Sequence, residues 1–365
     1  MIELRSVSKR YGDFTAVDDV SFRVEKGEVC VLIGPSGCGK STTIKLINRM
    51  LEPTAGEIIV DGKSIRSERP ELLRRGIGYV IQNIGLFPHM DVAENIAVVP
   101  KLLKWEPARI SERTNELLDL IGLDPARYAH KYPRHLSGGE AQRIGVARAL
   151  AADPPLLLMD EPFGAVDPLN RQTLQAEFLK IQKKLKKTVV FVTHDLDEAI
   201  RLADRIILLF KGKVVQDDSP EHLLSHPSSK FVRNFVGTDR ALKRLSRFTA
   251  ADYMRAPASV HLTDARFAER AVELQAQGVR FLWVTTEEDR LYGWVDLREV
   301  DSTHDIEASV TQIDPAETAI RSTYSLREAL SRMLGQGIRT APVVAEGNRL
   351  VGEISLRDIE QVTEG

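Results

Sequence analysis

The sequence has few of the features that mark secreted or membrane-embedded proteins. It contains only two cysteines, Cys30 and Cys38, too few for a disulfide framework, so we expect both thiols to be reduced packing residues. No run approaches the roughly 18–20 consecutive apolar residues that span a bilayer. The first residues, MIELRSVSKRYG, lack the apolar core of a signal peptide. We therefore expect a cytoplasmic protein.

The sequence also lacks an excess of charge of either sign. Its formal net charge is −2 and its pI is about 6.5, whereas proteins that bind nucleic acid normally carry a strong basic excess. We therefore expect no nucleic-acid partner. The length of 365 residues suits two domains, since domains usually contain roughly 100–250 residues.

The first two-thirds of the chain have the pattern of an α/β domain. Short apolar runs alternate with helical patterns up to about residue 236, which is typical of a largely parallel sheet; the runs are residues 29–34, 156–160, 188–193 and 205–210. Between residues 83 and 152 the pattern is mainly helical. We therefore expect a domain over residues 1–236, in which a helical subdomain at about 83–152 interrupts the sheet.

A phosphate-binding loop follows the first of these apolar runs. The stretch fits G-x-x-x-x-G-K-S and precedes a helical pattern that starts at Thr42, which is the context the motif requires. Its backbone N–H groups and Lys40 suit the phosphates of a nucleotide, and the hydroxyl of Ser41 suits Mg²⁺. The predicted nucleotide-binding residues are Gly34, Pro35, Ser36, Gly37, Cys38, Gly39, Lys40, Ser41 and Thr42.

Two adjacent carboxylates end the apolar run at residues 156–160. Asp160 suits the metal ion of a P-loop enzyme, and Glu161 is one residue further, where it can act as general base for an attacking water. The alternative is a pair of solvated carboxylates at a strand end. The phosphate-binding loop upstream favours the catalytic interpretation.

A second glycine-rich turn, residues 136–140, opens another helix and predicts a second anion site. This segment, LSGGE, resembles the LSGGQ signature of the ABC ATPase family. The resemblance implies that two copies pair head to tail, so that Ser137, Gly138 and Gly139 of one close over the ATP held by the other. Glu140 stands where the family most often has glutamine, and we expect it to alter dimer affinity or turnover without abolishing activity.

Four further residues occur where the ABC family has functional elements. The resemblance implies that Gln82 contacts Mg²⁺ and water, that Asp167 crosses the dimer interface, that His194 contacts the γ-phosphate, and that Tyr11 stacks on adenine. Together with Glu161, Gln82 and His194 complete the predicted catalytic set. Ser41, Gln82 and Asp160 complete the predicted Mg²⁺ set.

The cassette is more similar to transport ATPases than to soluble ABC proteins. About 95 residues separate Ser41 from Leu136, too few for the long coiled coil of the soluble classes. Residues 81–96 resemble quaternary-amine importers, which take up glycine betaine, choline, carnitine or proline betaine. That resemblance implies a peripheral subunit on the cytoplasmic face, a separate permease and, indirectly, a substrate-binding protein. Another small osmolyte or amino acid as cargo, or a soluble non-transport ATPase, remain the alternatives.

The last third contains an internal repeat. Residues 278–299 and 337–358 align without a gap at a spacing of 59, with nine of 22 positions identical, and each copy has the pattern helix, strand, turn, strand, helix. This repeat resembles a tandem pair of CBS domains. We expect a linker over residues 237–250, a first copy over 251–305 and a second over 306–365.

What the repeat senses is left open by the sequence. Ser355 and Asp358 keep a spacing that nucleotide-binding CBS domains use for ribose, whereas the first copy has Asp296 and Glu299 and lacks the hydroxyl. Asp358 on a solvated helix is the alternative. Docking of basic residues 240–247 on anionic lipid is a second hypothesis, although acidic residues outnumber basic ones after residue 240.

Overall fold

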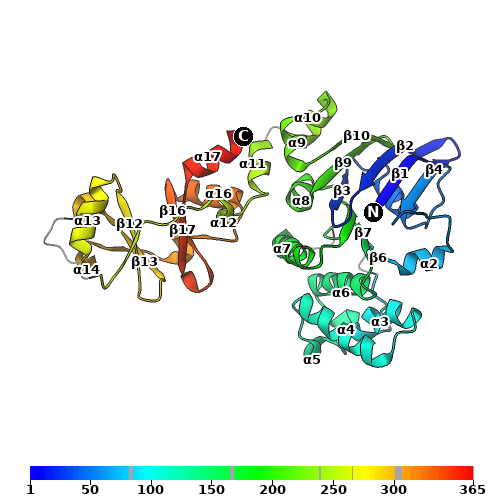
Figure 1. Cartoon of the computed structure of the whole chain (residues 1–365), viewed down its shortest axis with the longest axis horizontal. Helices are drawn as coiled ribbons and strands as arrows, with labels where there is room; N and C mark the ends of the chain where they lie inside the picture. The colour runs from blue at the N-terminus through cyan, green and yellow to red at the C-terminus, as the bar shows by residue number, and fades with distance from the viewer. Residues whose placement is uncertain (82–84, 165–167, 238–239, 265, 301–305, 365) are drawn as a thin grey trace. The chain divides into compact units, whose positions relative to one another are not determined.

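The computed structural model describes residues 1–81, 85–164, 168–237, 240–264, 266–300 and 306–364. The chain divides into two units, Met1–Gly237 and Thr238–Gly365 (Figure 1). Across the described residues, no helix combines the length and apolar character needed to cross a bilayer.

A six-stranded sheet forms the centre of the first unit. Its strand order is β10-β9-β3-β8-β7-β6, with only the β10–β9 pair antiparallel. The strands are β3 (Val29–Ile33), β6 (Ile77–Val80), β7 (Leu156–Asp160), β8 (Thr188–Val192), β9 (Arg205–Phe210) and β10 (Lys213–Asp218). Every residue of β3, β7 and β8 is buried, as expected for parallel strands covered on both faces. The predicted α/β class is confirmed.

A second, antiparallel sheet of order β2-β1-β4-β5 shares a hydrophobic core with one face of the six-stranded sheet. It contains β1 (Ile2–Tyr11), β2 (Phe14–Val24), β4 (Ala55–Val60) and β5 (Lys63–Ser64). Helix α1 (Lys40–Ile47) contributes Ile44, Leu46 and Ile47, all fully buried, to the core that joins the two sheets. The short helix α2 (Pro70–Arg75) leads into β6.

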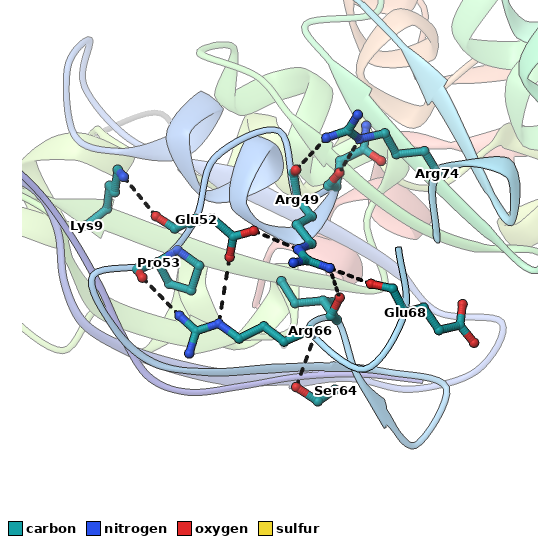
Figure 2. Close-up of polar contacts among 10 residues, drawn as sticks. Lys9, Arg49, Glu52, Pro53, Ser64, Arg66, Glu68 and Arg74 are labelled. Carbon is teal, nitrogen blue, oxygen red and sulfur yellow. Dashed lines mark hydrogen bonds and ion pairs between the residues drawn. The ribbon is translucent and has the colours of Figure 1, made fainter. Parts of the chain in front are cut away.

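An arginine network fixes the C-terminal end of α1. Arg49 donates to the carbonyl oxygens of Ile65 and Glu68 at 3.0 and 2.6 Å and to the Glu52 carboxylate at 2.7 Å (Figure 2). Arg74 of α2 in turn donates to the Arg49 carbonyl at 2.7 Å. Hydrogen bonds that satisfy backbone carbonyls after a helix end stabilise that end. The helix that follows the phosphate-binding loop is therefore held firmly at its far end.

Helices between β6 and β7 form the subdomain drawn in cyan and green below the sheet in Figure 1. They are α3 (Val92–Leu102), α4 (Pro107–Leu120), α5 (Pro125–Tyr128), the 3₁₀ turn η1 (Pro133–His135) and α6 (Gly138–Leu150). Their buried side chains share one core with the sheet and with α7 (Pro168–Leu185), α8 (Leu196–Leu202), α9 (Pro220–Ser225) and α10 (Lys230–Val236).

The second unit contains two small sheets, of order β11-β12-β13-β14 and β15-β16-β17. Its first half has α11 (Arg240–Leu245), α12 (Ala250–Tyr253), β11 (Ser259–His261), α13 (Phe267–Ala276), β12 (Phe281–Thr285), β13 (Leu291–Asp296) and η2 (Leu297–Glu299). Next are α14 (Ile306–Ser309), β14 (Thr311–Gln312), α15 (Pro315–Thr318) and β15 (Ile320–Arg321). The last elements are α16 (Leu326–Gln336), β16 (Thr340–Val344), η3 (Glu346–Asn348), β17 (Leu350–Ser355) and α17 (Leu356–Glu364).

The two copies of the repeat have the same strand register. Phe281 pairs with Asp296 in the first copy, and Thr340, 59 residues on, pairs with Ser355 in the second. Both hairpins shift register at the corresponding point, after Val284 and after Val343. The spacing seen in the sequence is therefore a structural repeat.

The copies differ where each hairpin ends. Ser355 and Asp358 exchange hydrogen bonds at the start of α17, whereas the Asp296 carboxylate accepts from the Arg298 N–H two residues on. An aspartate bonded at this short range favours a turn. The helix expected after β13 is accordingly a single 3₁₀ turn, η2, within the described residues.

The segment expected as a linker belongs to the second unit where the structure describes it. Residues 240–245 form α11, and Leu245 and Ala250 are fully buried in the core of the C-terminal copy. The buried side chains explain why this segment is helical and packed.

Candidate functional site

The phosphate-binding loop takes a shape that only glycine permits at two positions. Gly34 has φ +149°, and a β-carbon there would lie 2.1 Å from the Leu209 carbonyl oxygen. Gly39 has φ +106°, and its β-carbon would lie 2.5 Å from the Ala16 oxygen. Because side chains cannot occupy these places, the backbone can pack against neighbouring strands and still curve into α1.

Lys40 and Cys38 lie inside this loop. The Lys40 ammonium donates to the Gly34 and Pro35 carbonyl oxygens at 2.7 and 3.1 Å, and its side chain is 7% exposed. Burial raises the pKa of the Cys38 thiol, so it stays protonated and packs as the sequence predicted. Ser36 is exposed and Thr42 half-buried. The loop therefore holds a buried positive charge next to its exposed turn.

Ser41 and Asp160 meet across the core. The Ser41 hydroxyl donates to Asp160 Oδ1 at 3.0 Å. Burial raises the pKa of the Asp160 carboxyl, against the lowering effect of this hydrogen bond, and Asp160 is 7% exposed. It is therefore not one of a pair of solvated carboxylates. The Ser41 hydroxyl and the Asp160 carboxylate thus bring two oxygen ligands together. Mg²⁺ prefers oxygen ligands, so this pair of residues fits the ion.

Tyr79 of β6 lies near Asp160 and was not predicted as a site residue. Burial, with a smaller contribution from Asp160, raises the pKa of Tyr79 to about 12. Its ring is therefore neutral at physiological pH. Tyr79 lies near Asp160 because β6 pairs with β7. The residues around Tyr79 in the sequence therefore do not indicate that it belongs to the site.

Glu161 and His194 form a pair at the carboxyl ends of neighbouring strands. His194 Nδ1 lies 3.4 Å from Glu161 Oε2. Glu161 leaves β7 with φ +47°, and its N–H donates to the Val192 carbonyl oxygen of β8 at 3.0 Å. Since β3, β8 and β7 are adjacent and parallel, the loop, the two carboxylates and the histidine lie at one edge of the sheet, where open α/β sheets bind ligands.

A buried glutamate, Glu198, bonds to the residue that precedes His194. Glu198 of α8 is 5% exposed and accepts from Gln175 Nε2 of α7 at 3.1 Å, and Thr193, the residue before His194, also bonds to it. Asp195 caps α8 and lies 3.7 Å from Arg171. Sequence reasoning missed this support, although the spacing of Asp195 and Glu198 at a helix start was a usable signal.

The signature segment, residues 136–140, is built as a helix start. Ser137 caps α6 in a capping box with Glu140, whose Oε1 also accepts from the Tyr128 hydroxyl at 2.6 Å. A β-carbon on Gly138 would meet nothing within 4 Å. Among the hydrogen bonds and ion pairs of the described residues, none joins this segment to the phosphate-binding loop.

The remaining predicted residues are placed less completely. Tyr11 ends β1 with 46% of its surface exposed, and Lys9 Nζ lies 5.1 Å from its ring centroid, so its ring is accessible for stacking. Gln82 and Asp167 lie outside the described residues.

Comparison with known proteins identifies the family. A family model for ABC transporters matches residues 17–164, and a CBS-domain model matches residues 310–363. The osmoprotectant import ATP-binding protein OsmV of Salmonella typhimurium is 45% identical over 361 residues, covering 97% of this chain and 94% of that protein. The chain belongs to the ATP-binding proteins of ABC transporters.

One further relative matches over nearly the whole chain, and a solved structure matches over the first unit's length. The choline transport ATP-binding protein OpuBA of Bacillus subtilis is 46% identical over 97% of this chain and 94% of its own. Among solved structures, a dimeric ATP-binding cassette in a post-hydrolysis state with ADP and Pi is 34% identical. It covers 60% of this chain and 99% of its own, with a TM-score of 0.54. This chain is thus an ABC ATPase with a CBS domain at its C-terminal end.

Proposed function

We propose that this chain is the ATPase subunit that powers import of a quaternary-amine osmoprotectant, of the glycine betaine, choline or carnitine type. The observation that carries the proposal is the extent of similarity. Relatives named for osmoprotectant, choline and carnitine transport are 44–46% identical over 97% of this chain, the CBS region included. A spermidine/putrescine import ATPase of Chromobacterium violaceum is 42% identical, but over 70% of the chain.

The loop and Lys40 bind the nucleotide in this proposal. The exposed turn at Ser36 and Gly37 offers N–H groups to phosphate oxygens, and the buried Lys40 ammonium supplies a full positive charge. Tyr11 stacks on adenine. Ser41 and Asp160, with Gln82, would hold Mg²⁺, which would neutralise phosphate charge when bound.

Glu161 is the general base for hydrolysis. Its carboxylate, held by the φ +47° backbone and the bond to Val192, accepts a proton from the attacking water. His194, 3.4 Å away, orients that carboxylate and contacts the γ-phosphate. Thr193 and Glu198 hold the histidine's backbone in place from the core side.

Two copies act as a head-to-tail pair. Gly138, directly after Ser137, leaves open space at the start of α6, which suits a phosphate brought by a second copy. Asp167 crosses that interface. The related cassette solved as a dimer with ADP and Pi supports the pairing of two copies.

The pair sits peripherally on the cytoplasmic face of the membrane, bound to permease subunits that receive cargo from a substrate-binding protein. We propose that the CBS region regulates it by binding either an adenine nucleotide or anionic lipid. A nucleotide at Asp358 must compete with Arg255, whose guanidinium lies 2.9 Å from that carboxylate. The Asp358 side chain is also only 13% exposed, although its neighbour Arg357 on the same helix is exposed.

Substrate competition tests the cargo class. The chain is reconstituted in vesicles with its own permease and binding protein, and uptake of labelled glycine betaine is measured with an excess of unlabelled choline, carnitine, proline or putrescine. We expect choline or carnitine to compete. Competition by proline or putrescine alone would assign another small-solute importer, and failure to find a permease partner would favour a soluble ATPase.

A further inference from the structure

Both carboxylate oxygens of Glu140 are used inside its own protein. Oε2 accepts from the Ser137 N–H at 2.7 Å, and Oε1 accepts from the Tyr128 hydroxyl at 2.6 Å. The Tyr128 ring also has Lys131 Nζ 3.8 Å from its centroid. The side chain is therefore turned back along α6 toward α5.

Two donors converging on one side chain match a carboxylate better than an amide. Glutamine has one acceptor oxygen, which the Ser137 N–H would occupy, so its NH₂ group would have to donate to the Tyr128 hydroxyl, and the hydroxyl would no longer donate to residue 140. Only a carboxylate accepts both hydrogen bonds in the direction seen here. The hydrogen bond from Tyr128 and then that from Ser137 hold the pKa of Glu140 below its usual value. Glu140 is thus a stable anion here, and Tyr128 provides a reason for a glutamate at this position.

Tyr128 is itself firmly placed. The carbonyl oxygens of Ala129 and Lys131, just after it, accept from the N–H groups of Ala93 and Val92 at 2.9 Å each. These bonds occupy donors in the first turn of α3 that have no partner within the helix. Tyr128 therefore ties the signature helix α6 to the start of α3.

We propose that Tyr128 is a positioning residue for ATP hydrolysis. Its hydroxyl holds the Glu140 carboxylate against Ser137, so that the open face at Gly138 receives the second copy's ATP without a carboxylate turned toward it. The proposal rests on the head-to-tail pairing proposed above. Without the hydroxyl, Oε1 loses its partner, the carboxylate is released toward that face, and it repels the incoming triphosphate.

The test is steady-state ATP hydrolysis by the full chain in complex with its permease. Tyr128→Phe should raise KM for ATP about tenfold, equivalent to ~1.4 kcal/mol. It should change kcat much less, because Glu161 and His194 are untouched. Since the cause is charge repulsion, the rise in KM should shrink at high salt.

Two variants separate this role from a general loss of packing. Glu140→Asp keeps the charge but is too short to reach Tyr128, so it should raise KM even if Tyr128→Phe folds poorly. Glu140→Gln added to Tyr128→Phe should return KM toward the wild-type value, because the amide has no charge. Tyr132→Phe is the control, since that ring packs edge-on to His135 and has no contact with Glu140.

An unchanged KM in both Tyr128→Phe and Glu140→Asp would overturn the proposal, as would a raised KM that Glu140→Gln does not relieve. A wild-type complex that hydrolyses ATP as a single cassette, or without any solute uptake, would instead contradict the proposed function. The two failures are therefore distinguishable.

Discussion

The Ser41 hydroxyl donates a 3.0 Å hydrogen bond to Asp160 Oδ1, although 119 residues separate the two along the chain. This contact joins the start of α1 to the end of β7 and places two oxygens where a phosphate-bound cation is needed. It also places Glu161, the next residue, beside His194. The geometry of hydrolysis in this account depends on that one contact.

Removing the Ser41 hydroxyl or the negative charge of Asp160 should weaken Mg²⁺ binding. Ser41→Ala and Asp160→Asn should each raise the Mg²⁺ concentration for half-maximal ATP hydrolysis by at least about tenfold. Because the two residues touch, the double variant should be affected less than the sum of the single effects. Asp204→Asn, in which the altered carboxylate bonds the Val29 N–H at the opposite end of β3, should leave the Mg²⁺ requirement unchanged. Equal Mg²⁺ curves for wild type and Asp160→Asn would contradict the assignment.

The loop should tolerate alanine at one glycine and not at another. Gly34→Ala brings a β-carbon to 2.1 Å from Leu209 O, so the loop must distort, and we expect nucleotide binding to be lost. The β-carbon of Gly37→Ala would meet nothing within 4 Å. This variant should lose only ~1–2 kcal/mol of folding stability, because alanine takes a left-handed backbone conformation less easily than glycine. ATP affinity and thermal unfolding of both variants measure the difference. Equal tolerance at the two positions would show that the close packing of Gly34 is unimportant.

Glu198 should make stability depend on pH. Burial raises the pKa of this carboxyl, so the unfolded chain ionises more easily than the native one. The native state therefore loses stability as pH rises from the ordinary glutamate value through the raised one. Glu198→Gln cannot ionise, so its melting temperature relative to wild type should increase as the pH rises above the ordinary pKa of a glutamate. A difference that stays constant as the pH rises would mean that Glu198 titrates as an exposed carboxyl does.

Asp358 should stabilise the second unit through its cap and its ion pair. It accepts from the Ser355 N–H at 2.8 Å, and its carboxylate lies 2.9 Å from Arg255. Asp358→Ala should therefore cost about 1–2 kcal/mol, as other lost N-terminal caps do. Denaturant unfolding measures the loss, with the exposed Arg357→Ala as control. If Asp358→Ala unfolds at the same denaturant concentration as Arg357→Ala, these contacts contribute nothing to stability.

The sequence predicted the parts of the site that lie in continuous motifs. The loop at Gly34–Ser41 and the pair Asp160–Glu161 could be recognised because neighbouring residues carry the chemistry and the flanking strand and helix patterns are strong. The repeat was visible because its two copies keep one spacing, and the structure keeps the same register.

The contacts between distant elements could not be predicted. Tyr128 meets Glu140 only because α5 packs beside the start of α6, and Arg255 meets Asp358 across 103 positions of the chain. The prediction of a helix after β13 was wrong for a local reason. The Asp296 carboxylate accepts from the Arg298 N–H and forms a short turn, whereas Ser355 at the matching position starts a helix. These features depend on which side chains meet in the folded protein, and the pattern of apolar residues along the chain does not show that.

Accumulation of labelled glycine betaine shows whether ATP hydrolysis by this chain powers quaternary-amine import. It is measured in vesicles that hold the complete complex, with ATP supplied on the ATPase side. We expect wild type to concentrate the solute against its gradient. Glu161→Gln should still bind ATP, remain in the closed pair, and lose at least about a hundredfold in both hydrolysis and uptake, the lower range of a general base's contribution. Accumulation at the wild-type rate by Glu161→Gln, or none by wild type for any quaternary amine, would contradict it.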